Sequence, residues 1–187
     1  MKKLILAAVA ALGIASSPAL AQIDGDFSGF KGAALTGYDN TDFGKVYIGS
    51  DRFDLKNAQG LIYGATLGYD RQSGRFVYGV ELEATDSAAD VNDPFLGEIK
   101  LGREFYAGGR IGFVVDKHLM IYGKGGYADT RLRTVGFQSV GLDGFKLGGG
   151  VEYKFSDKVF ARGEYRYSEL DRGLKRNQGL AAVGLRF

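Results

Sequence analysis

Hydrophobic and polar residues alternate along much of this chain with a period of two. The clearest example is the segment 144–170. From Phe145 to Phe155 the odd positions are apolar or aromatic apart from one glycine, and the even positions are charged or glycine. After the polar turn Ser156–Lys158 the alternation resumes. This pattern predicts a β-hairpin with two unlike faces, and each of its strands is about ten residues long or longer, against the ~5–6 that are typical of soluble proteins.

The same alternation recurs and predicts eight strands in all. Their approximate ranges are 26–38, 60–71, 76–84, 97–115, 118–129, 144–155, 159–170 and 178–187. Short turns at 72–75, 116–117 and 156–158 alternate with longer polar segments at 39–59, 85–95, 130–142 and 171–177. This rhythm predicts an all-β, eight-stranded antiparallel up-and-down barrel with all of its short turns on one rim.

An eight-stranded barrel encloses only enough room for packed side chains or one small ligand, so the direction of its two faces is decisive. In a soluble barrel the apolar face points inward and the charged face meets water. In a transmembrane barrel the apolar face meets lipid, and the charged side chains must pair inside because isolated charges are costly there. The polar face holds acids and bases in similar number, and the expected lumenal charge network comprises Glu81, Glu98, Lys100, Glu104, Arg110, Lys124, Lys146, Glu152, Arg162, Glu164 and Arg166.

Three patterns favour the transmembrane β-barrel over the soluble alternative. The strands have the ~10 residues that a tilted strand needs to cross a bilayer. Loop lengths differ strongly between the two rims. Aromatic residues gather near the strand ends, as interface girdles do: Tyr38, Phe105, Phe145 and Tyr167 near one rim, and Phe76, Phe113 and Phe155 near the other.

The N-terminal residues have the composition of a secretory signal. Met1–Lys3 is positively charged, residues 4–14 are apolar, and Ala19–Ala21 is a small-x-small cleavage site. We therefore expect residues 1–21 to be a cleaved signal peptide and 22–187 to form the barrel domain. The chain contains no cysteine, so disulfides and cysteine-ligated metals are excluded, and its 30 glycines and many aromatic residues are typical of a β-barrel rather than of disorder.

The segment GGRIGFVVDKHLMIYGKGGYA, residues 108–128, resembles the central hairpin of the bacterial outer-membrane β-barrel family that includes opacity-type surface proteins and OmpA-like, immunogenic porin-like antigens. The segments GGGVEYKF and ARGEYRY look like the penultimate hairpin of that family, and the final GLRF resembles its last strand. The resemblance implies a location in the outer membrane of a Gram-negative cell. It also implies that Phe187 is the signal read by the barrel-assembly machinery. It is a poor guide to function, because the family is functionally diverse.

The residue pattern offers little chemistry. The single histidine, His118, lies at a short turn, far from the long-loop rim where outer-membrane hydrolases place a catalytic histidine, so we expect no enzymatic activity. The barrel carboxylates are expected to pair with lysine or arginine. We expect no bound metal or cofactor, and the net charge of +2 indicates no nucleic-acid partner.

We therefore expect a non-enzymatic barrel that contributes to envelope integrity and to surface interaction, adhesin-like or antigen-like, through its extracellular loops. Its expected partners are outer-membrane lipid, lipopolysaccharide and a host surface or matrix. Basic residues in or near the loops are candidates for contact with lipopolysaccharide phosphates: Arg131, Arg133, Arg172, Lys175 and Arg176. The alternative function is a narrow channel for small solutes, with lumenal space at Gly64, Gly79, Gly126, Gly148 and Gly184.

Overall fold

A computed structural model describes residues 26–42, 45–48, 51–54, 58–87, 90–93, 97–134, 140–170 and 174–187. Within these residues eight long strands form one antiparallel sheet: β1 (Gly29–Asp42), β4 (Ala58–Ser73), β5 (Phe76–Ser87), β7 (Gly97–Asp116), β8 (Leu119–Thr134), β9 (Val140–Lys154), β10 (Val159–Leu170) and β11 (Leu174–Arg186). Each strand pairs with its sequence neighbour among these eight, and β1 also pairs with β11, which closes the barrel. The eight-stranded up-and-down barrel predicted from the alternation is confirmed.

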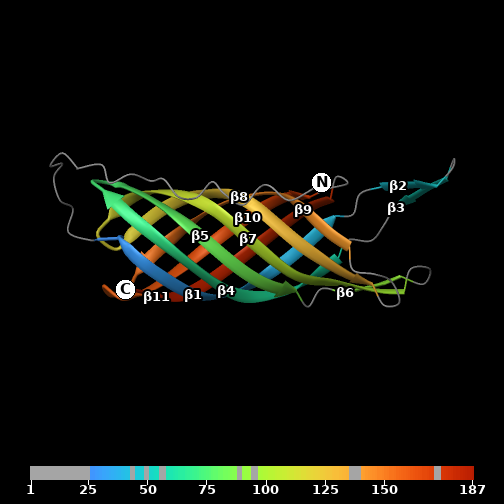
Figure 1. The fold of residues 1–187 in the computed structure, drawn as a ribbon, viewed down its shortest axis with the longest axis horizontal. Helices are drawn as coiled ribbons and strands as arrows, with labels where there is room; N and C mark the ends of the chain where they lie inside the picture. Colours follow the sequence, from blue (N-terminus) through green and yellow to red (C-terminus); the bar gives the residue numbers. More distant parts are fainter. Residues whose placement is uncertain are drawn as a thin grey trace, which may run out of the picture.

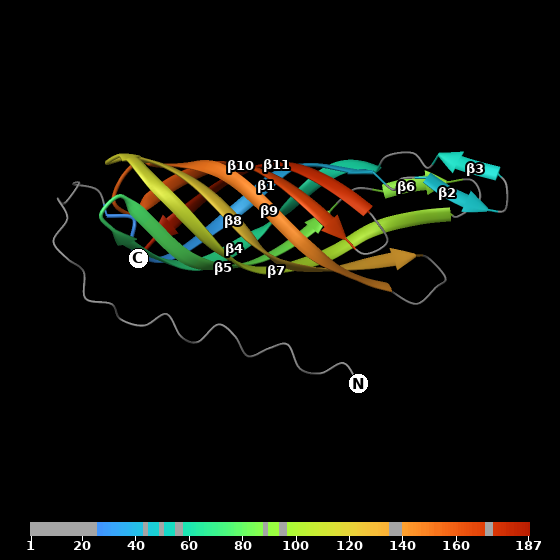
Figure 2. The same ribbon diagram turned by 90° about the horizontal axis from the view of Figure 1, so that it is seen from above.

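The two rims of the barrel differ, as Figures 1 and 2 show. One end carries the C-terminus and the short connections β4–β5, β7–β8 and β9–β10, and we call it the short-turn rim. At the opposite, long-loop rim the hairpin of β2 (Lys45–Ile48) and β3 (Asp51–Asp54) projects beyond the barrel, and β6 (Asp90–Asp93) extends the sheet along β7. The predicted arrangement of short turns on one rim is confirmed.

Several strands extend further than the alternation predicted. Strand β1 continues to Asp42 and β11 begins at Leu174, because the β1–β11 ladder runs on to the pair Asp42↔Lys175. Likewise β8 and β9 continue toward the long-loop rim as far as the pair Leu132↔Val140. The segments predicted as loops at 39–59, 85–95, 130–142 and 171–177 therefore contain strand residues.

The turns at the short-turn rim are tight. Gly74 has a φ of 60°, the left-handed conformation that the predicted 72–75 turn requires of its glycine. The turn predicted at 116–117 lies one residue later, at Lys117–His118, since Asp116 still pairs with Leu119. His118 is half-buried there and its ring stacks on Tyr153, with 6.0 Å between centroids.

Side chains alternate between the two faces of the barrel wall as predicted. On β9, Phe145, Leu147, Val151 and Tyr153 are exposed on the outer face, while Lys146 and Glu152 are completely buried inside. The barrel thus has its apolar side chains outside and its charged side chains inside, the reverse of a soluble barrel. Separately, no helix among the described residues is long and apolar enough to cross a membrane.

Candidate functional site

The lumen of the barrel is filled by charged side chains that pair across it in layers. Nine of the eleven residues expected in the lumenal network are buried: Glu81, Glu104, Arg110, Lys124, Lys146, Glu152, Arg162, Glu164 and Arg166. The side chains of the other two, Glu98 and Lys100, lie outside the described part of the structure, although the backbone places both on β7. The lumen can be described as three layers that follow the barrel axis.

The layer nearest the short-turn rim contains two carboxylates and two guanidinium groups. Arg110 donates from Nε to Asp70 Oδ1 at 2.9 Å and from Nη1 to Glu152 Oε2 at 2.9 Å. Arg186 donates from Nη2 to Glu152 Oε1 at 2.6 Å and to Asp70 Oδ2 at 3.1 Å. Each acid therefore binds both bases, and the four side chains come from β4, β7, β9 and β11, so this layer ties alternate strands together across the lumen.

The middle layer is centred on two glutamates of β5. Lys124 Nζ lies 2.7 Å from Glu81 Oε1 and 3.4 Å from Glu83 Oε2. Arg162 donates to Glu81 Oε2 at 2.6 Å, and Arg166 donates to Glu83 Oε2 at 2.7 Å. These contacts join β5 to β8, the second strand along the sheet, and to β10, which lies directly opposite in the closed barrel.

Two further side chains complete the middle layer. Glu164 accepts a hydrogen bond from the Tyr122 hydroxyl at 2.6 Å and lies 3.0 Å from Lys124 Nζ. Lys31 Nζ lies 3.4 Å from Asp70 and 3.2 Å from Glu81, so it links the middle layer to the layer below. The ion pairs thus form a connected network rather than a set of separate pairs.

The layer nearest the long-loop rim is centred on Glu104. Its carboxylate pairs with Lys146, accepts from Thr130 Oγ1 at 3.0 Å and accepts from Arg176 Nη1 at 2.6 Å. Arg176 also donates from Nε to Asp39 Oδ2 at 2.7 Å. This layer spans β1, β7, β8, β9 and β11.

The position of Arg176 corrects one sequence-based expectation. The sequence predicts contact of Arg176 with lipopolysaccharide from a loop, but the residue is buried in the lumen and bound to Glu104 and Asp39. On β11 it alternates with the exposed Lys175, so its side chain points inward because the strand begins earlier than predicted. Of the other residues in that set, Lys175 is exposed, Arg131 and Arg133 lie on β8 with side chains outside the described part, and Arg172 lies outside the described residues.

The network also contains residues that the sequence-based set omitted. They are Lys31, Asp39, Asp70 and Arg186. Glu83, which the alternation also places on the inward face, is buried in the network as well. Three of the four omitted residues lie at inward positions of their predicted strands, so the alternation could have found them, whereas Asp39 lay in a predicted loop.

Apolar side chains close the lumen at the short-turn rim. Phe27, just before β1, is completely buried in a cluster with Val77, Val114 and Met120. Its backbone N–H donates to Gln72 Oε1 at 2.8 Å, and Lys154 Nζ lies 4.9 Å from the centroid of its ring. The segment around Phe27 thus covers the charged layers at the short-turn rim.

The space beside the lumenal glycines is occupied by neighbouring atoms. A Cβ added at Gly184 would lie 2.6 Å from Phe160 Cζ, and one at Gly148 would lie 3.2 Å from Arg166 Cγ. At Gly64, Gly79 and Gly126 an added Cβ would overlap backbone carbonyl oxygens of adjacent strands, and at Gly79 also the carboxylate of Asp70. Side chains and backbone of neighbouring strands therefore occupy the space that the channel alternative requires at these five positions.

The outer face carries an apolar belt bordered by aromatic side chains. Toward the long-loop rim, Tyr38 donates to Gln59 Oε1 at 2.9 Å and Tyr165 donates to Asn177 Oδ1 at 2.7 Å. Toward the short-turn rim, Phe30 packs on Tyr69 and Phe76 packs on Phe113, both edge to face. Exposed rings with polar groups just beyond them are the arrangement of a membrane interface.

Two residues at the edges of the outer face agree with this arrangement. Arg103, a charged residue on the otherwise apolar outer face of β7, has a 68% exposed side chain whose Nε lies 3.9 Å from Asp86. Phe187, expected to be the assembly signal, is 79% exposed, and its backbone N–H donates to Phe30 O at 2.8 Å. Neither residue belongs to the lumen.

Comparisons with known proteins agree with this architecture. The family model of the outer membrane protein beta-barrel domain matches residues 7–187. The 25 kDa outer-membrane immunogenic protein of Brucella ovis is 30% identical over 131 residues, covering 66% of this chain and 62% of that protein. The chain therefore matches about three fifths of the length of this relative. The 22 kDa outer membrane protein of Rhizobium leguminosarum bv. viciae is 29% identical over 178 residues, covering 87% of this chain and 79% of that protein.

Solved structures share the fold at low sequence identity. Neisserial surface protein A has a TM-score of 0.59 and 16% identity, with 86% of this chain and 98% of that chain covered. OprG from Pseudomonas aeruginosa has a TM-score of 0.56 and 13% identity, with 89% and 99% covered. Ail of Yersinia pestis, solved with the heparin analogue sucrose octasulfate, has a TM-score of 0.52 and 17% identity, with 85% and 99% covered. At these identities the likeness concerns the fold alone.

Proposed function

Because the chain belongs to the outer membrane protein beta-barrel domain family and lies in the outer membrane, we propose that it is a non-enzymatic barrel whose extracellular loops carry its function. Short turns in this class of barrel are periplasmic and long loops extracellular. The β2–β3 hairpin and the β6–β7 extension then project from the cell. The proposed role is envelope integrity together with surface interaction, adhesin-like or antigen-like.

The observation that carries this proposal is the connected ion-pair network in the lumen. Glu81, Glu104 and Glu152 each bind two or more cationic side chains, and every one of these groups is buried. Breaking such a network leaves unpaired charge, which is costly, so the interior is a poor solute path and a rigid support. The surface that remains for interaction is the set of loops. The name of the Brucella relative, an immunogenic outer-membrane protein, supports exposure of that surface.

The proposed partners follow from the location. Lys175 is exposed on β11 at the extracellular end, where it would meet lipopolysaccharide phosphates, and Arg131, Arg133 and Arg172 are proposed to join it. A host surface or matrix is the proposed partner of the loops. Recognition of Phe187 by the barrel-assembly machinery and cleavage of residues 1–21 are proposed for biogenesis.

The test uses the full-length chain in intact cells. We compare wild type with a variant in which a short Gly-Ser turn replaces residues 44–55, which carry the β2–β3 hairpin outside the barrel. Heat-modifiable gel migration checks that both barrels fold. We expect the trimmed variant to lose adhesion to matrix-coated surfaces and recognition by antibodies raised against whole cells. Unchanged adhesion and recognition would contradict the assignment of function to this loop.

Planar-bilayer recording separates the proposal from the channel alternative. The purified barrel is expected to show no conductance steps at any voltage, because side chains and backbone of adjacent strands occupy the space beside the lumenal glycines. Reproducible steps from the purified wild-type protein would favour the channel.

A further inference from the structure

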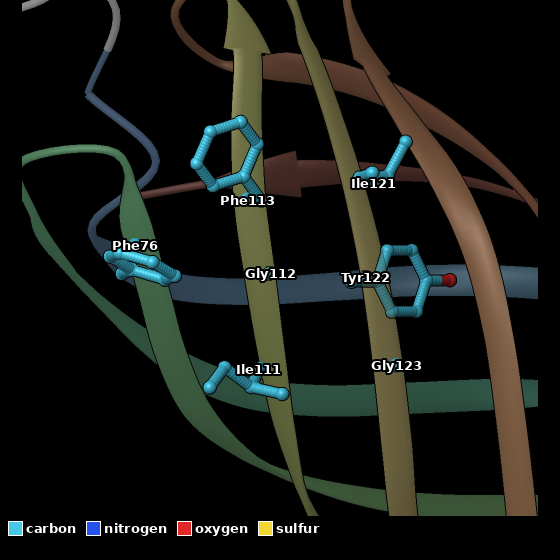
Figure 3. A pocket seen from close by; sticks show the side chains of 7 residues that line it. All are labelled: Phe76, Ile111, Gly112, Phe113, Ile121, Tyr122 and Gly123. Atoms are coloured by element: carbon cyan, nitrogen blue, oxygen red, sulfur yellow. The ribbon is translucent and has the colours of Figure 1, made fainter.

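A groove of about 350 Å³ opens on the outer face of the barrel between β5, β7 and β8 (Figure 3). The outward-facing side chains of Phe76, Ile111, Phe113 and Ile121 surround it. Gly123 makes the hollow, because it lies opposite Ile111 in the β7–β8 register and has no side chain of its own. The groove is therefore almost wholly apolar and lies within the belt that faces lipid.

The periplasmic end of the groove is flanked by positive charge. Arg75, in the turn before Phe76, is exposed, and its guanidinium carbon lies 5.9 Å from the centroid of the Phe113 ring. Its carbonyl oxygen accepts from Val114 N at 2.8 Å, which fixes this turn against β7. Lys117 is exposed in the adjacent β7–β8 turn, where its backbone N–H donates to the carboxylate of Asp116 at 2.7 Å. Arg75 thus places a cation beside a lining residue of the apolar groove, and Lys117 and Asp116 lie in the neighbouring turn.

We propose that this groove holds one phospholipid of the periplasmic leaflet, with an acyl chain against Gly123 and the phosphate at Arg75. An apolar hollow that ends at a cation matches the order of groups along a phospholipid, from hydrocarbon to phosphodiester. Arginine binds phosphate oxygens through a fork of N–H donors, and its stem covers apolar surface on the way to the interface. The site is a lipid-binding site in addition to the loop function.

A second copy of the chain fits the same surface less well. Two barrels in one membrane related by a two-fold axis along the membrane normal bring the same rim of each subunit together. Arg75 and Lys117 would then approach their own copies, and like charges at an interface are unfavourable. A phosphate group would neutralise the positive charge of Arg75, whereas a second copy of the chain would bring a further positive charge to it.

Native mass spectrometry of the intact barrel tests the proposal. The barrel is released from detergent in the presence of phosphatidylglycerol, and diacylglycerol serves as a probe with the same chains and no phosphate. Gly123→Leu fills the groove, and it should fold because an added Cβ meets only Gly148 O, at 3.8 Å. Arg75→Gln removes the charge. The matched controls are Gly163→Leu, at an outward glycine with nothing within 4 Å of an added Cβ, and Lys158→Gln, in another periplasmic turn.

Wild type and both controls should retain one phosphatidylglycerol. Gly123→Leu and Arg75→Gln should each bind it about tenfold more weakly, as expected for loss of roughly 1.4 kcal/mol of contact. Diacylglycerol should bind wild type and Arg75→Gln alike. Equal retention by Gly123→Leu and Gly163→Leu would contradict the assignment of the acyl chain to the groove. Equal retention by Arg75→Gln and Lys158→Gln would contradict the assignment of the phosphate to Arg75. A dimer in wild type that Gly123→Leu abolishes would assign the groove to a second copy and also overturn the proposal.

Discussion

Glycines in the wall of the lumen provide the space in which the long charged side chains lie. Gly68 is covered by the stem of Lys31, whose Cε would be 2.8 Å from an added Cβ, and Gly148 is covered in the same way by Arg166. An eight-stranded barrel has little interior volume, so it can hold this many charged residues only if neighbouring wall positions are empty of side chains. The abundance of glycine in the sequence thus has a packing cause.

Substitution of a lumenal glycine should therefore be more harmful than substitution of an outward one. A Cβ at Gly79 overlaps the carboxylate of Asp70 and the carbonyl of Tyr69, whereas a Cβ at Gly163 meets nothing within 4 Å. We expect Gly79→Ala to lower the free energy of unfolding by about 1–3 kcal/mol, and Gly163→Ala to leave it nearly unchanged. Urea unfolding of the barrel in lipid vesicles measures both. Similar effects of the two changes would contradict the packing explanation.

Glu152 tests the electrostatic side of the network. It is completely buried and accepts from Arg110 and Arg186, so Glu152→Leu leaves two guanidinium groups with one carboxylate, Asp70, between them. Removing one partner of a buried ion pair typically costs about 3–5 kcal/mol. We expect a loss of that size in vesicle unfolding and a lower temperature for the heat-modifiable shift on gels.

The matched control for Glu152→Leu is Glu169→Leu, at an exposed position of β10. This control removes a carboxylate of the same size from the barrel without unpairing a lumenal base. If the two variants unfolded alike, the network would not contribute to stability.

At the scale of single residues, the odd or even position of a residue along its strand is enough to predict most of the side chains that line the lumen. The sequence alone places Glu81, Arg110 and Glu152 inside, because the lipid-facing side of a barrel wall tolerates no unpaired charge. The odd–even rule does not identify Arg176 as lumenal, because its neighbours form a basic, glycine-containing run typical of a loop. Only the pairing of β11 with β1, which continues to Asp42↔Lys175, shows that this run is partly strand. Such pairing is a long-range contact and leaves no local mark in the sequence.

At the scale of a strand, a single substitution can test which face of the barrel wall meets lipid. On β9, Val151 lies on the outer face between Phe145 and Phe155, and it is 48% exposed. A charge at this position would be placed in hydrocarbon. We expect Val151→Arg to lower the free energy of unfolding by about 2–4 kcal/mol, or to block assembly.

Ser156→Arg, in the exposed turn after the same strand, is the control for Val151→Arg. It adds the same charge outside the hydrocarbon and removes only one exposed hydrogen bond, from Val159 N to Ser156 Oγ at 3.1 Å, so it should lower stability much less than Val151→Arg. Vesicle unfolding and the yield of heat-modifiable protein in the outer membrane give the comparison. A mild effect at Val151 would mean that this face does not meet lipid.

The existence of the strands was predictable, and their length was not. All eight predicted strands occur, because period-two alternation depends only on the two environments of a barrel wall. The ends of β1, β8, β9 and β11 were missed because these strands continue beyond the membrane belt. Beyond the belt the outward side chains are polar, as at Asn40 and Lys175, while inward side chains such as Arg176 stay buried. The alternation of apolar with polar residues that marks a strand therefore disappears, although the backbone ladder continues.

For the molecule as a whole, the topology can be tested with single cysteines, because the chain has none of its own. Arg52→Cys lies in the β2–β3 hairpin and Asp157→Cys lies in the β9–β10 turn, at opposite rims. A membrane-impermeant maleimide added to intact cells should label the first and not the second. Lysed cells should label both. Labelling of Asp157→Cys in intact cells would mean that the barrel has the opposite orientation in the membrane.

The closing pair of strands has a consequence for the order in which the barrel folds. Arg186 on β11 donates to Phe27 O across 159 positions of the chain, and the two strands pair from Lys31↔Arg186 to Asp42↔Lys175. Until that ladder forms, β1 and β11 each have an open edge, and open edges invite pairing with other chains. Contacts so distant in sequence form slowly, because loop-closure entropy opposes them. We therefore expect the unclosed sheet to be the form that aggregates, and a chaperone that shields edge strands to raise the yield of folded barrel.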